Sequence, residues 1–281
     1  MTLGLAGGGW TAEILPIQGA TFGRLTYEGR DLLVPIPPDT APIGPFHGAF
    51  LMAPWTNRLD AGRIEAAGRV WHMPINRPTE HTALHGLLRD LPWHVESQAP
   101  GSAVLNRTLD HPPFHVAARM KVALSARGLS LELALTNLSR HATPLGLGWH
   151  PFFVRLPGTR LRFGARVVFG RDSRNLPIAP RPIAGLDGGD AVLDGLDTHF
   201  AGWDGVAEIT WPGSRALVLR AAGAWRANLQ VFAPRDSGIL AVEPVSHAPD
   251  SANRSVAAAH GAMDVVESRG TLAASLTIHW R

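Results

Sequence analysis

Apolar residues recur at every second position along several stretches of this sequence. In residues 129–136 leucine occupies every odd position, and Ser, Glu, Ala and Thr occupy the even ones. Residues 272–280 repeat the pattern with apolar side chains at every even position. A period of two places alternate side chains on opposite faces of a strand, whereas a helix needs a period of 3.6. The chain is therefore predicted to form half-buried β-strands.

Turn-forming residues separate further candidate strands along the whole chain. Gly 30 and Pro 23 together make up about 19% of the 281 residues, against roughly 12% in average usage. This surplus argues against a helix bundle or coiled coil and suits many short strands. The further strands are expected at residues 103–109, 114–125, 206–211, 216–221, 228–233 and 239–243.

Helical patterns are few. Residues 252–266 could hold one or two turns, which Gly261 interrupts, and residues 156–189 are so rich in Arg, Pro and Gly that we expect an irregular connection. No repeat, low-complexity tract or linker marks a domain boundary. The prediction is an all-β chain, one domain over residues 1–281, folded as a large antiparallel β-sandwich with few short helices.

The charge balance points away from nucleic acid and membranes. Lys+Arg 26 and Asp+Glu 23 give a net charge of +3, and the sequence pI of about 10.4 is high only because almost nothing titrates between histidine and arginine. No basic run, signal-peptide pattern or long apolar run is present. The absence of cysteine excludes disulfides and thiolate chemistry. We expect a soluble, cytoplasmic protein, monomeric or homodimeric, with a small-molecule partner.

Five short stretches concentrate polar residues that strand packing would not need. They are residues 53–59 (APWTNRL), 81–86 (HTALHG), 146–153 (GLGWHPFF), 196–200 (LDTHF) and 241–245 (AVEPV). Polar groups set beside apolar strands in this way are candidates for a binding or catalytic site.

Two residues in these stretches suit proton transfer. Glu243 follows four apolar residues and precedes Pro244, so it is either a solvated carboxylate at the end of a strand, the commoner case, or a base in a pocket. His150, between Trp149 and Pro151, is either a core histidine bonded to a carbonyl or a general acid. The residues alone leave both alternatives open.

Metal and nucleotide sites are not expected. His81 and His85 have the HxxxH spacing that places two ligands on one face of a helix, but Gly86 disfavours a helix and no acidic partner follows at ligand spacing. The sequence contains no P-loop, dinucleotide fingerprint or GxSxG motif. No cofactor is therefore predicted.

In this order, the five stretches resemble the aldose 1-epimerase (galactose mutarotase) family. The series is Asn-Arg, His-Gly, a His before a Phe-containing strand, Asp-x-x-Phe, and Glu-Pro with residues 249–253 (PDSAN) close behind. The resemblance extends from about Gly19 to the C-terminus and implies the large sandwich called a supersandwich. The His-Gly pair is followed by Leu87-Leu88-Arg89, which is more similar to divergent bacterial members.

The resemblance also implies roles for individual residues. Glu243 matches the catalytic base and His150 the catalytic acid. The substrate-binding positions are the second active-site histidine, His85, with Arg58, Asp197 and the adjacent Asn57. We expect a nearby carboxylate, for which Glu243 is one candidate, to raise the pKa of His150. Trp55 or Trp149 could stack on the sugar ring, although core packing is the commoner place for a tryptophan.

The expected activity is the interconversion of the α and β anomers of a free aldohexose. Three alternatives remain. Arg89 resembles the arginines of hexose-6-phosphate 1-epimerases, and a non-catalytic sugar-binding protein could have the same fold. A glycoside hydrolase would need two carboxylates, for which Glu243 and Asp197 are the candidates.

Overall fold

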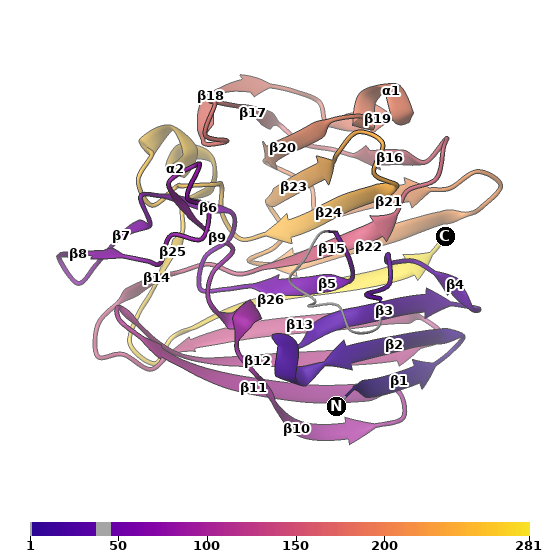
Figure 1. The fold of residues 1–281 in the computed structure, drawn as a ribbon, viewed down its shortest axis with the longest axis horizontal. Helices are drawn as coiled ribbons and strands as arrows, with labels where there is room; N and C mark the ends of the chain where they lie inside the picture. Colours follow the sequence, from indigo (N-terminus) through magenta and orange to yellow (C-terminus); the bar gives the residue numbers. More distant parts are fainter. Residues whose placement is uncertain (1, 38–45) are drawn as a thin grey trace.

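Two large antiparallel sheets form most of the molecule (Figure 1). The structure is a computed structural model that describes residues 2–37 and 46–281. Strands account for 56% of the chain and helices for 6%. The prediction of an all-β, antiparallel architecture is therefore confirmed.

The first sheet has eleven strands within the described residues and contains both His150 and Glu243. In spatial order its strands are β1 (Leu3–Gly7), β2 (Trp10–Leu15), β3 (Thr21–Tyr27), β5 (Ala49–Met52), β15 (Gly148–Val154), β24 (Ile239–Val245), β23 (Asn228–Ala233), β20 (Leu196–Ala201), β17 (Val167–Arg171) and β18 (Pro177–Pro182), with β4 (Arg30–Asp31) paired to β3.

The second sheet has nine strands within the same residues. They are β10 (His94–Ala99), β11 (Ser102–His111), β12 (Phe114–Ser125), β13 (Gly128–Asn137), β26 (Thr271–Trp280), β22 (Ala216–Gly223), β21 (Val206–Thr210), β16 (Arg160–Phe163) and β19 (Leu186–Gly188). Three two-stranded pairs complete the described strands: β6 (Arg58–Asp60) with β9 (Thr82–Leu84), β7 (Arg63–Ala66) with β8 (Arg69–His72), and β14 (Thr143–Leu145) with β25 (Asp264–Val266).

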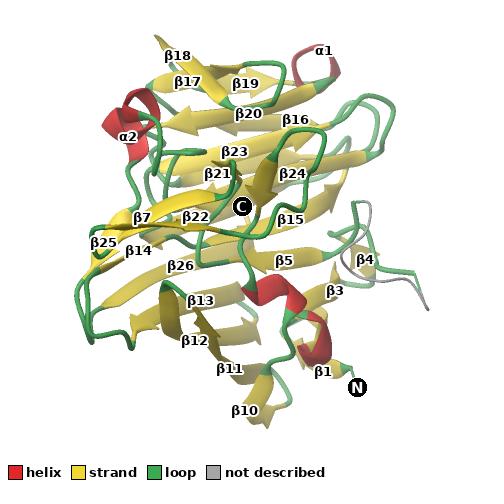
Figure 2. Cartoon of the chain, turned by 60° about the vertical axis from the view of Figure 1, so that its left-hand side comes forward, coloured by secondary structure: helices red, strands yellow, loops and turns green. Residues whose placement is uncertain are grey.

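Helices are short (Figure 2). They are α1 (Asp190–Leu193), α2 (Ser255–Gly261) and the single 3₁₀ turns η1 (Pro16–Gln18) and η2 (Leu88–Asp90). In the part of the chain that the structure describes, none of them has the length and apolar character needed to cross a bilayer. α2 ends at Gly261, as the sequence predicts.

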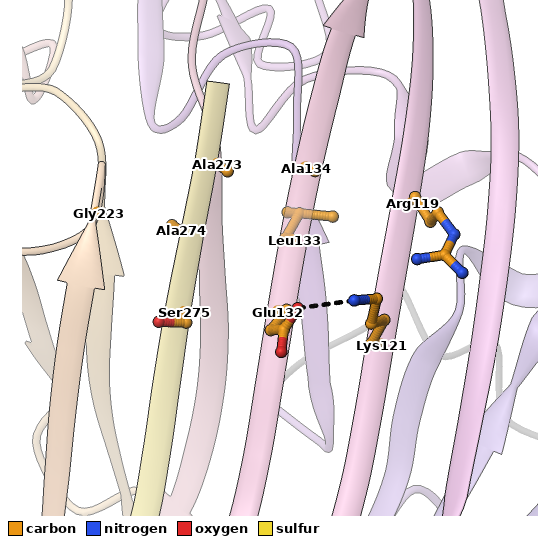
Figure 3. A pocket seen from close by; sticks show the side chains of 9 residues that line it. All are labelled: Arg119, Lys121, Glu132, Leu133, Ala134, Gly223, Ala273, Ala274 and Ser275. Carbon is orange, nitrogen blue, oxygen red and sulfur yellow. Dashed lines mark hydrogen bonds and ion pairs between the residues drawn. The ribbon is translucent and has the colours of Figure 1, made fainter. Parts of the chain in front are cut away.

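The alternating leucines form part of the core between the sheets. Leu129, Leu131, Leu133 and Leu135 of β13 are all at most 1% exposed and belong to a cluster of buried residues drawn from both large sheets. The even positions of the strand face outward, where Glu132 pairs with Lys121 at 3.2 Å. Small residues such as Gly223, Ala134 and Ala273 leave a shallow hollow of about 400 Å³ on this outer face (Figure 3).

Two expectations about strand boundaries are wrong. Residues 156–189 contain strands β16 to β19 in place of an irregular connection. Their prolines are tolerated because β18, which holds three of them, is the last strand of its sheet and needs partners on one side only. β24 also continues beyond Glu243 through Pro244 to Val245.

A buried histidine fixes the loop that leads into β6. His247 is 0% exposed; its Nε2 accepts a hydrogen bond from the Thr56 N–H at 3.1 Å, and its Nδ1 lies 2.9 Å from the Ala248 carbonyl oxygen. The proton is therefore on Nδ1. Burial lowers the pKa of this ring to about 4. Gly146 packs so closely that a Cβ there would lie 2.4 Å from the ring.

We expect His247→Ala to lower the free energy of unfolding by about 2–4 kcal/mol at pH 7, because it leaves a cavity and an unpaired N–H. The unfolded histidine binds a proton near pH 6.5, the folded one near 4. The stability that the uncharged ring provides is complete above about pH 6.5 and is lost as the pH falls towards 4. Denaturant titrations at pH 7 and 5 should show that the free energy of unfolding decreases less between these pH values in the variant than in the wild type. Exposed His94→Ala is the control, and equal pH slopes for the wild type and His247→Ala would contradict the assignment.

Candidate active site

A row of side chains crosses five neighbouring strands of the eleven-stranded sheet. Phe50 of β5 is paired with His150 of β15, Gln230 of β23 with Glu243 of β24, and His199 of β20 with Gln230. Residues that lie opposite one another in a sheet project to the same face. The five side chains therefore share one side of the sheet.

The register of β15 against β24 joins the two halves of this row. Gly148 pairs with Val245 and Phe152 with Ala241, which places His150 directly opposite Glu243. The ladder is interrupted between these two pairs, where Pro151 and Pro244 supply no N–H. The His150 Nε2 and the Glu243 Oε1 lie 3.3 Å apart. Two residues 93 positions apart in the sequence are thus in direct contact.

The row faces a cavity of about 700 Å³ on the side of the sheet away from the main core. Trp149 and Val242, one residue away from His150 and Glu243, point the other way, into the core between the sheets. The cavity volume is in the range of small-molecule sites. It is lined by all six residues singled out from the sequence: Asn57, Arg58, His85, His150, Asp197 and Glu243.

The β6–β9 pair and its flanking residues bring three of these side chains over the sheet. Asn57 and His85 both have left-handed backbone angles, with φ of 52° and 65°, and the His85 N–H donates to the Asn57 carbonyl oxygen at 2.9 Å. At Gly86 a Cβ would lie 2.1 Å from the Ala53 carbonyl oxygen, so only glycine fits there. This close approach sets the His85 ring edge-on to His150, with ring centroids 5.2 Å apart.

Arg58 is held by a two-pronged ion pair. Its Nε and Nη2 donate to the two carboxylate oxygens of Glu80 at 2.7 and 3.1 Å. Burial opposes ionisation of Glu80, but these hydrogen bonds and the Arg58 charge outweigh it, so the pKa of the carboxyl is lowered. Nη1 of Arg58 lies 3.2 Å from the Asn57 Oδ1. Arg58 therefore enters the cavity in a fixed orientation.

Asp197 is held from two sides. The Gln230 Nε2 donates to its Oδ1 at 2.7 Å, and Arg171 forms an ion pair with its Oδ2. Among the described residues, the buried Oε1 of Gln230 has no hydrogen-bond donor. A hydroxyl group of a ligand could satisfy this acceptor.

Burial shifts the two facing groups in opposite directions. Burial, together with the charge of Asp197, raises the pKa of Glu243 well above its usual range. Burial, assisted by the charge of Arg89, lowers the pKa of His150 to about 3. Burial therefore favours the uncharged form of each group, a protonated carboxyl for Glu243 and a neutral imidazole for His150.

The expectation that Glu243 raises the pKa of His150 is therefore wrong. Glu243 would favour a charged imidazole 3.3 Å away only if its own carboxyl were ionised. The free-energy cost of transferring both charges from water to this buried site exceeds the free energy that one ion pair provides. The sequence could show that the two residue types were present, but it could not show that both would be buried.

The expected tryptophan platform is also wrong. Trp55 and Trp149 are 1% and 0% exposed and belong to the core. The apolar wall of the cavity comes from phenylalanines instead. Phe50 stacks on the His150 ring with centroids 4.6 Å apart, and the Phe152 ring lies 4.5 Å from it.

Sequence reasoning missed Gln230, Phe50 and Phe152. Gln230 carries the same signal as Glu243, a polar residue inside an apolar strand, and Phe152 lies two positions from His150 on the same face. Phe50 has no comparable signal in the sequence. In residues 2–37 and 46–281, no group of three or more His, Asp or Glu side chains is arranged to hold a metal ion.

Comparison with known proteins identifies the family of the chain. Residues 3–268 match the family model described as aldose 1-epimerase. The chain belongs to the aldose 1-epimerase family. This confirms the resemblance seen in the sequence.

Sequence identity to the individual relatives described here is 33% or lower. The chain is 33% identical to the uncharacterized protein YihR of Escherichia coli K12 over 157 residues, 54% of this chain and 50% of that protein. It is 26% identical to the uncharacterized protein YphB of the same strain over 227 residues, 73% of this chain and 75% of YphB. The match therefore spans half the length of YihR. A galactose mutarotase-like protein from Clostridium acetobutylicum has the same fold, with a TM-score of 0.88, 18% identity and coverage of 99% and 94% of the two chains.

We expect the His150 imidazole to remain uncharged down to about pH 4, because its pKa is about 3. Nitrogen-15 NMR of labelled protein reports the ring's protonation state directly, and His150→Asn identifies its signal. Free histidine in the same buffer, which becomes charged near pH 6.5, serves as the reference. A His150 midpoint at or above 6.5 would contradict the assignment of the proton to Glu243.

Proposed function

We propose that this protein is an aldose 1-epimerase that interconverts the α and β anomers of an aldohexose with a free C1 hydroxyl. The observation that carries the proposal is the contact between Glu243 and His150, 3.3 Å apart, at the wall of a 700 Å³ cavity. An acid and a base placed this close can act on two atoms of one small ligand.

The reaction needs two proton transfers at one carbon. The bond between C1 and the ring oxygen O5 breaks as the C1 hydroxyl loses its proton and O5 gains one. The aldehyde then turns about C1–C2, and O5 attacks the other face of C1 while the protons return. The two reacting oxygens are bonded to the same carbon, which suits a base and an acid that touch each other. No electron transfer occurs, and no cofactor is proposed.

Glu243 is the proposed base and His150 the proposed acid. The pair is proposed to hold one proton, which burial favours on Glu243. A sugar whose C1 hydroxyl donates to Glu243 and whose O5 accepts from His150 favours transfer of that proton to the imidazole. Ring opening then passes the C1 proton to Glu243 and the imidazole proton to O5. Ring closure runs the same steps in reverse, so the pair again holds one proton.

The remaining polar residues are proposed to orient the sugar. Arg58 offers N–H donors that Glu80 has already oriented, and Asp197 accepts hydrogen bonds from hydroxyls. Asn57 and His85 complete the proposed binding set. Positioning of this kind converts binding energy into rate.

Two other functions make different demands on the site. A non-catalytic sugar-binding protein has no use for an acid and a base in contact. A glycoside hydrolase would need Asp197 as its second carboxylate, but the ion pair with Arg171 and the hydrogen bond from Gln230 already engage that group. Polarimetry of freshly dissolved α-glucose, beside a glycosidase assay, separates the three.

We expect Glu243→Gln and His150→Asn each to lower kcat by about 10²–10⁴, the usual effect of losing a general acid or base. Glu243→Gln keeps the size and shape of the side chain, so its melting temperature should change little. His150→Asn places a smaller amide beside Phe50 and Phe152, and circular dichroism with thermal melting will show that it is folded at the assay temperature. Anomer exchange measured by NMR, after subtraction of the spontaneous rate, is the readout. Exposed Glu132→Gln is the matched control. Near-normal exchange in either active-site variant would overturn the roles assigned here.

We expect kcat to stay constant across neutral pH and to fall on both sides of a wide plateau. Below about pH 3 His150 also binds a proton, and no base remains. As the pH rises through the elevated pKa of Glu243 the pair loses its only proton, and no acid remains. An acid limb near pH 6.5 would instead show that His150 titrates as an exposed histidine does. Rates are to be corrected for spontaneous anomerisation at each pH.

A further inference from the structure

Arg58 and Asp197, the two charged residues proposed to orient the sugar, come from separate parts of the fold. Asp197 lies on β20 inside the eleven-stranded sheet, whereas Arg58 begins β6, which forms a two-stranded pair with β9. Both groups can contact one sugar in a single productive geometry only if the distance between β6 and β20 is fixed. The turn between β17 and β18, at the edge of the large sheet, connects the two parts.

Asn175 in this turn bridges the partners of the two charged groups. Its Nδ2 donates to the Glu80 Oε1 at 2.8 Å, and its Oδ1 accepts from the Arg171 Nη1 at 3.0 Å. Glu80 is the carboxylate that holds Arg58, and Arg171 forms the ion pair with Asp197. One continuous series of polar contacts, which we call the bridge, thus runs from Arg58 through Glu80, Asn175 and Arg171 to Asp197.

The charges along the bridge explain why an amide stands at its centre. Asn175 meets a carboxylate on one side and a guanidinium on the other, so it must donate to the first and accept from the second. A side-chain amide does both, whereas a carboxylate only accepts and an ammonium only donates. Burial opposes ionisation of Glu80, but hydrogen bonds from Arg58 and Asn175 and the Arg58 charge lower the pKa of its carboxyl.

The backbone of the turn presents Asn175 in this position. Asn175 has a left-handed φ of 61°, which asparagine adopts more readily than most residues. Its N–H donates to the Asp172 carbonyl oxygen at 3.0 Å. The Asp172 Oδ1 accepts from the N–H groups of Arg174 and Leu176 at 2.8 and 2.9 Å. The turn is therefore ordered by its own hydrogen bonds.

Arg174 attaches the turn to the β6–β9 pair independently of Asn175. Its Nε donates to the Glu80 carbonyl oxygen at 2.9 Å, and its guanidinium forms an ion pair with Asp60, the last residue of β6. A change at Asn175 should therefore break the bridge without releasing the turn.

We propose that Asn175 is a positioning residue for the sugar, which fixes the separation of Arg58 and Asp197 and the direction of their polar groups. The inference rests on the proposed function, because that function assigns sugar hydroxyls to these two residues. Asn175 lies beside a small niche that Arg58 and Asp197 also line, so it acts through them. Groups that are ordered before the sugar arrives lose less conformational entropy when it binds.

Two variants divide the bridge. Asn175→Gly keeps the left-handed backbone, which suits glycine, and removes both hydrogen bonds. Asn175→Asp keeps the size of the side chain and the acceptor for Arg171 but sets a second carboxylate against Glu80, so it breaks only the link towards Arg58. We expect each to lower kcat/KM for anomer exchange at pH 8 by about ten- to a hundredfold, the usual effect of a hydrogen bond to a charged group. The assay uses whichever of glucose, galactose and glucose 6-phosphate the wild type converts best, and thermal melting shows that each variant is folded.

A double-variant cycle tests the route. In the Arg58→Ala background, Asn175→Asp should change kcat/KM by less than about twofold, because the link that it breaks no longer leads to a guanidinium. A residue that only stabilises the fold would give effects that multiply in the double variant.

Nitrogen-15 NMR of the arginine side chains gives a readout that does not depend on activity. The Nε–H signal of Arg58 is identified with Arg58→Lys. In both Asn175 variants this proton should exchange with water about tenfold faster or more, because the ion pair with Glu80 opens more often.

Asn106→Asp is the matched control. The Asn106 Nδ2 donates to the Glu96 Oε2 at 3.3 Å, and Arg119 holds the two oxygens of Glu96 at 2.9 and 2.8 Å. The nine-stranded sheet thus carries the same Arg–Glu–Asn arrangement away from the cavity lining. This variant should leave kcat/KM and the Arg58 signal unchanged.

The possible outcomes separate this proposal from the epimerase. Unchanged Arg58 proton exchange in both Asn175 variants, unchanged kcat/KM, or effects that multiply in the cycle overturns the positioning role and leaves the epimerase intact. A wild type that binds these sugars but exchanges no anomers overturns the epimerase, and Kd from titration calorimetry then replaces kcat/KM. Weaker binding by the Asn175 variants, with faster Arg58 exchange, would support the positioning role, and equal Kd values would overturn it. A wild type that binds none of the three sugars overturns both.

Discussion

The pairing of β15 with β24 is the constraint on which the site depends. A shift of one residue in this register would turn either His150 or Glu243 towards the core and separate them. The register is held at both ends by paired residues and by the core side chains between them, so the contact is as rigid as the sheet itself. The interruption at Pro151 and Pro244 removes backbone hydrogen bonds without releasing either strand. The contact therefore takes its geometry from the middle of a sheet. Asp197 and Gln230 come from neighbouring strands of the same sheet, and Arg58 comes from the β6–β9 pair.

Burial determines how the site is charged. The same desolvation that raises the pKa of Glu243 lowers that of His150, so one proton is retained by a pair with no net charge. The two arginines Arg58 and Arg89 of the cavity differ in how their guanidinium groups are hydrogen-bonded. Arg58 donates two hydrogen bonds to Glu80, whereas Arg89 lies 3.8 Å from the Asp90 carboxylate and its Nε has no hydrogen-bond acceptor among the described residues.

Much of the architecture could be predicted from the sequence because alternation is a local property. The leucines of β13 have a period of two whatever surrounds them. The four strands between residues 156 and 189 could not be predicted, because their prolines are acceptable only at a sheet edge, and edge position is a property of the finished fold. The six candidate site residues came from motif order, and the structure brings all of them to one cavity. Their roles remain predictions. Protonation states, the phenylalanine wall and the position of Gln230 in the cavity depend on contacts between strands that lie far apart in the sequence.

The outer face of the nine-stranded sheet has a practical consequence. Lys121 is the only lysine of the chain. It projects from this face, 47% exposed at its side chain, while the cavity opens on the far side of the other sheet. A reagent that couples to amines would meet one side-chain amine, that of Lys121, besides the terminal amine of the chain. It would leave the lining of the cavity unmodified, so the protein could be immobilised or labelled with the cavity free.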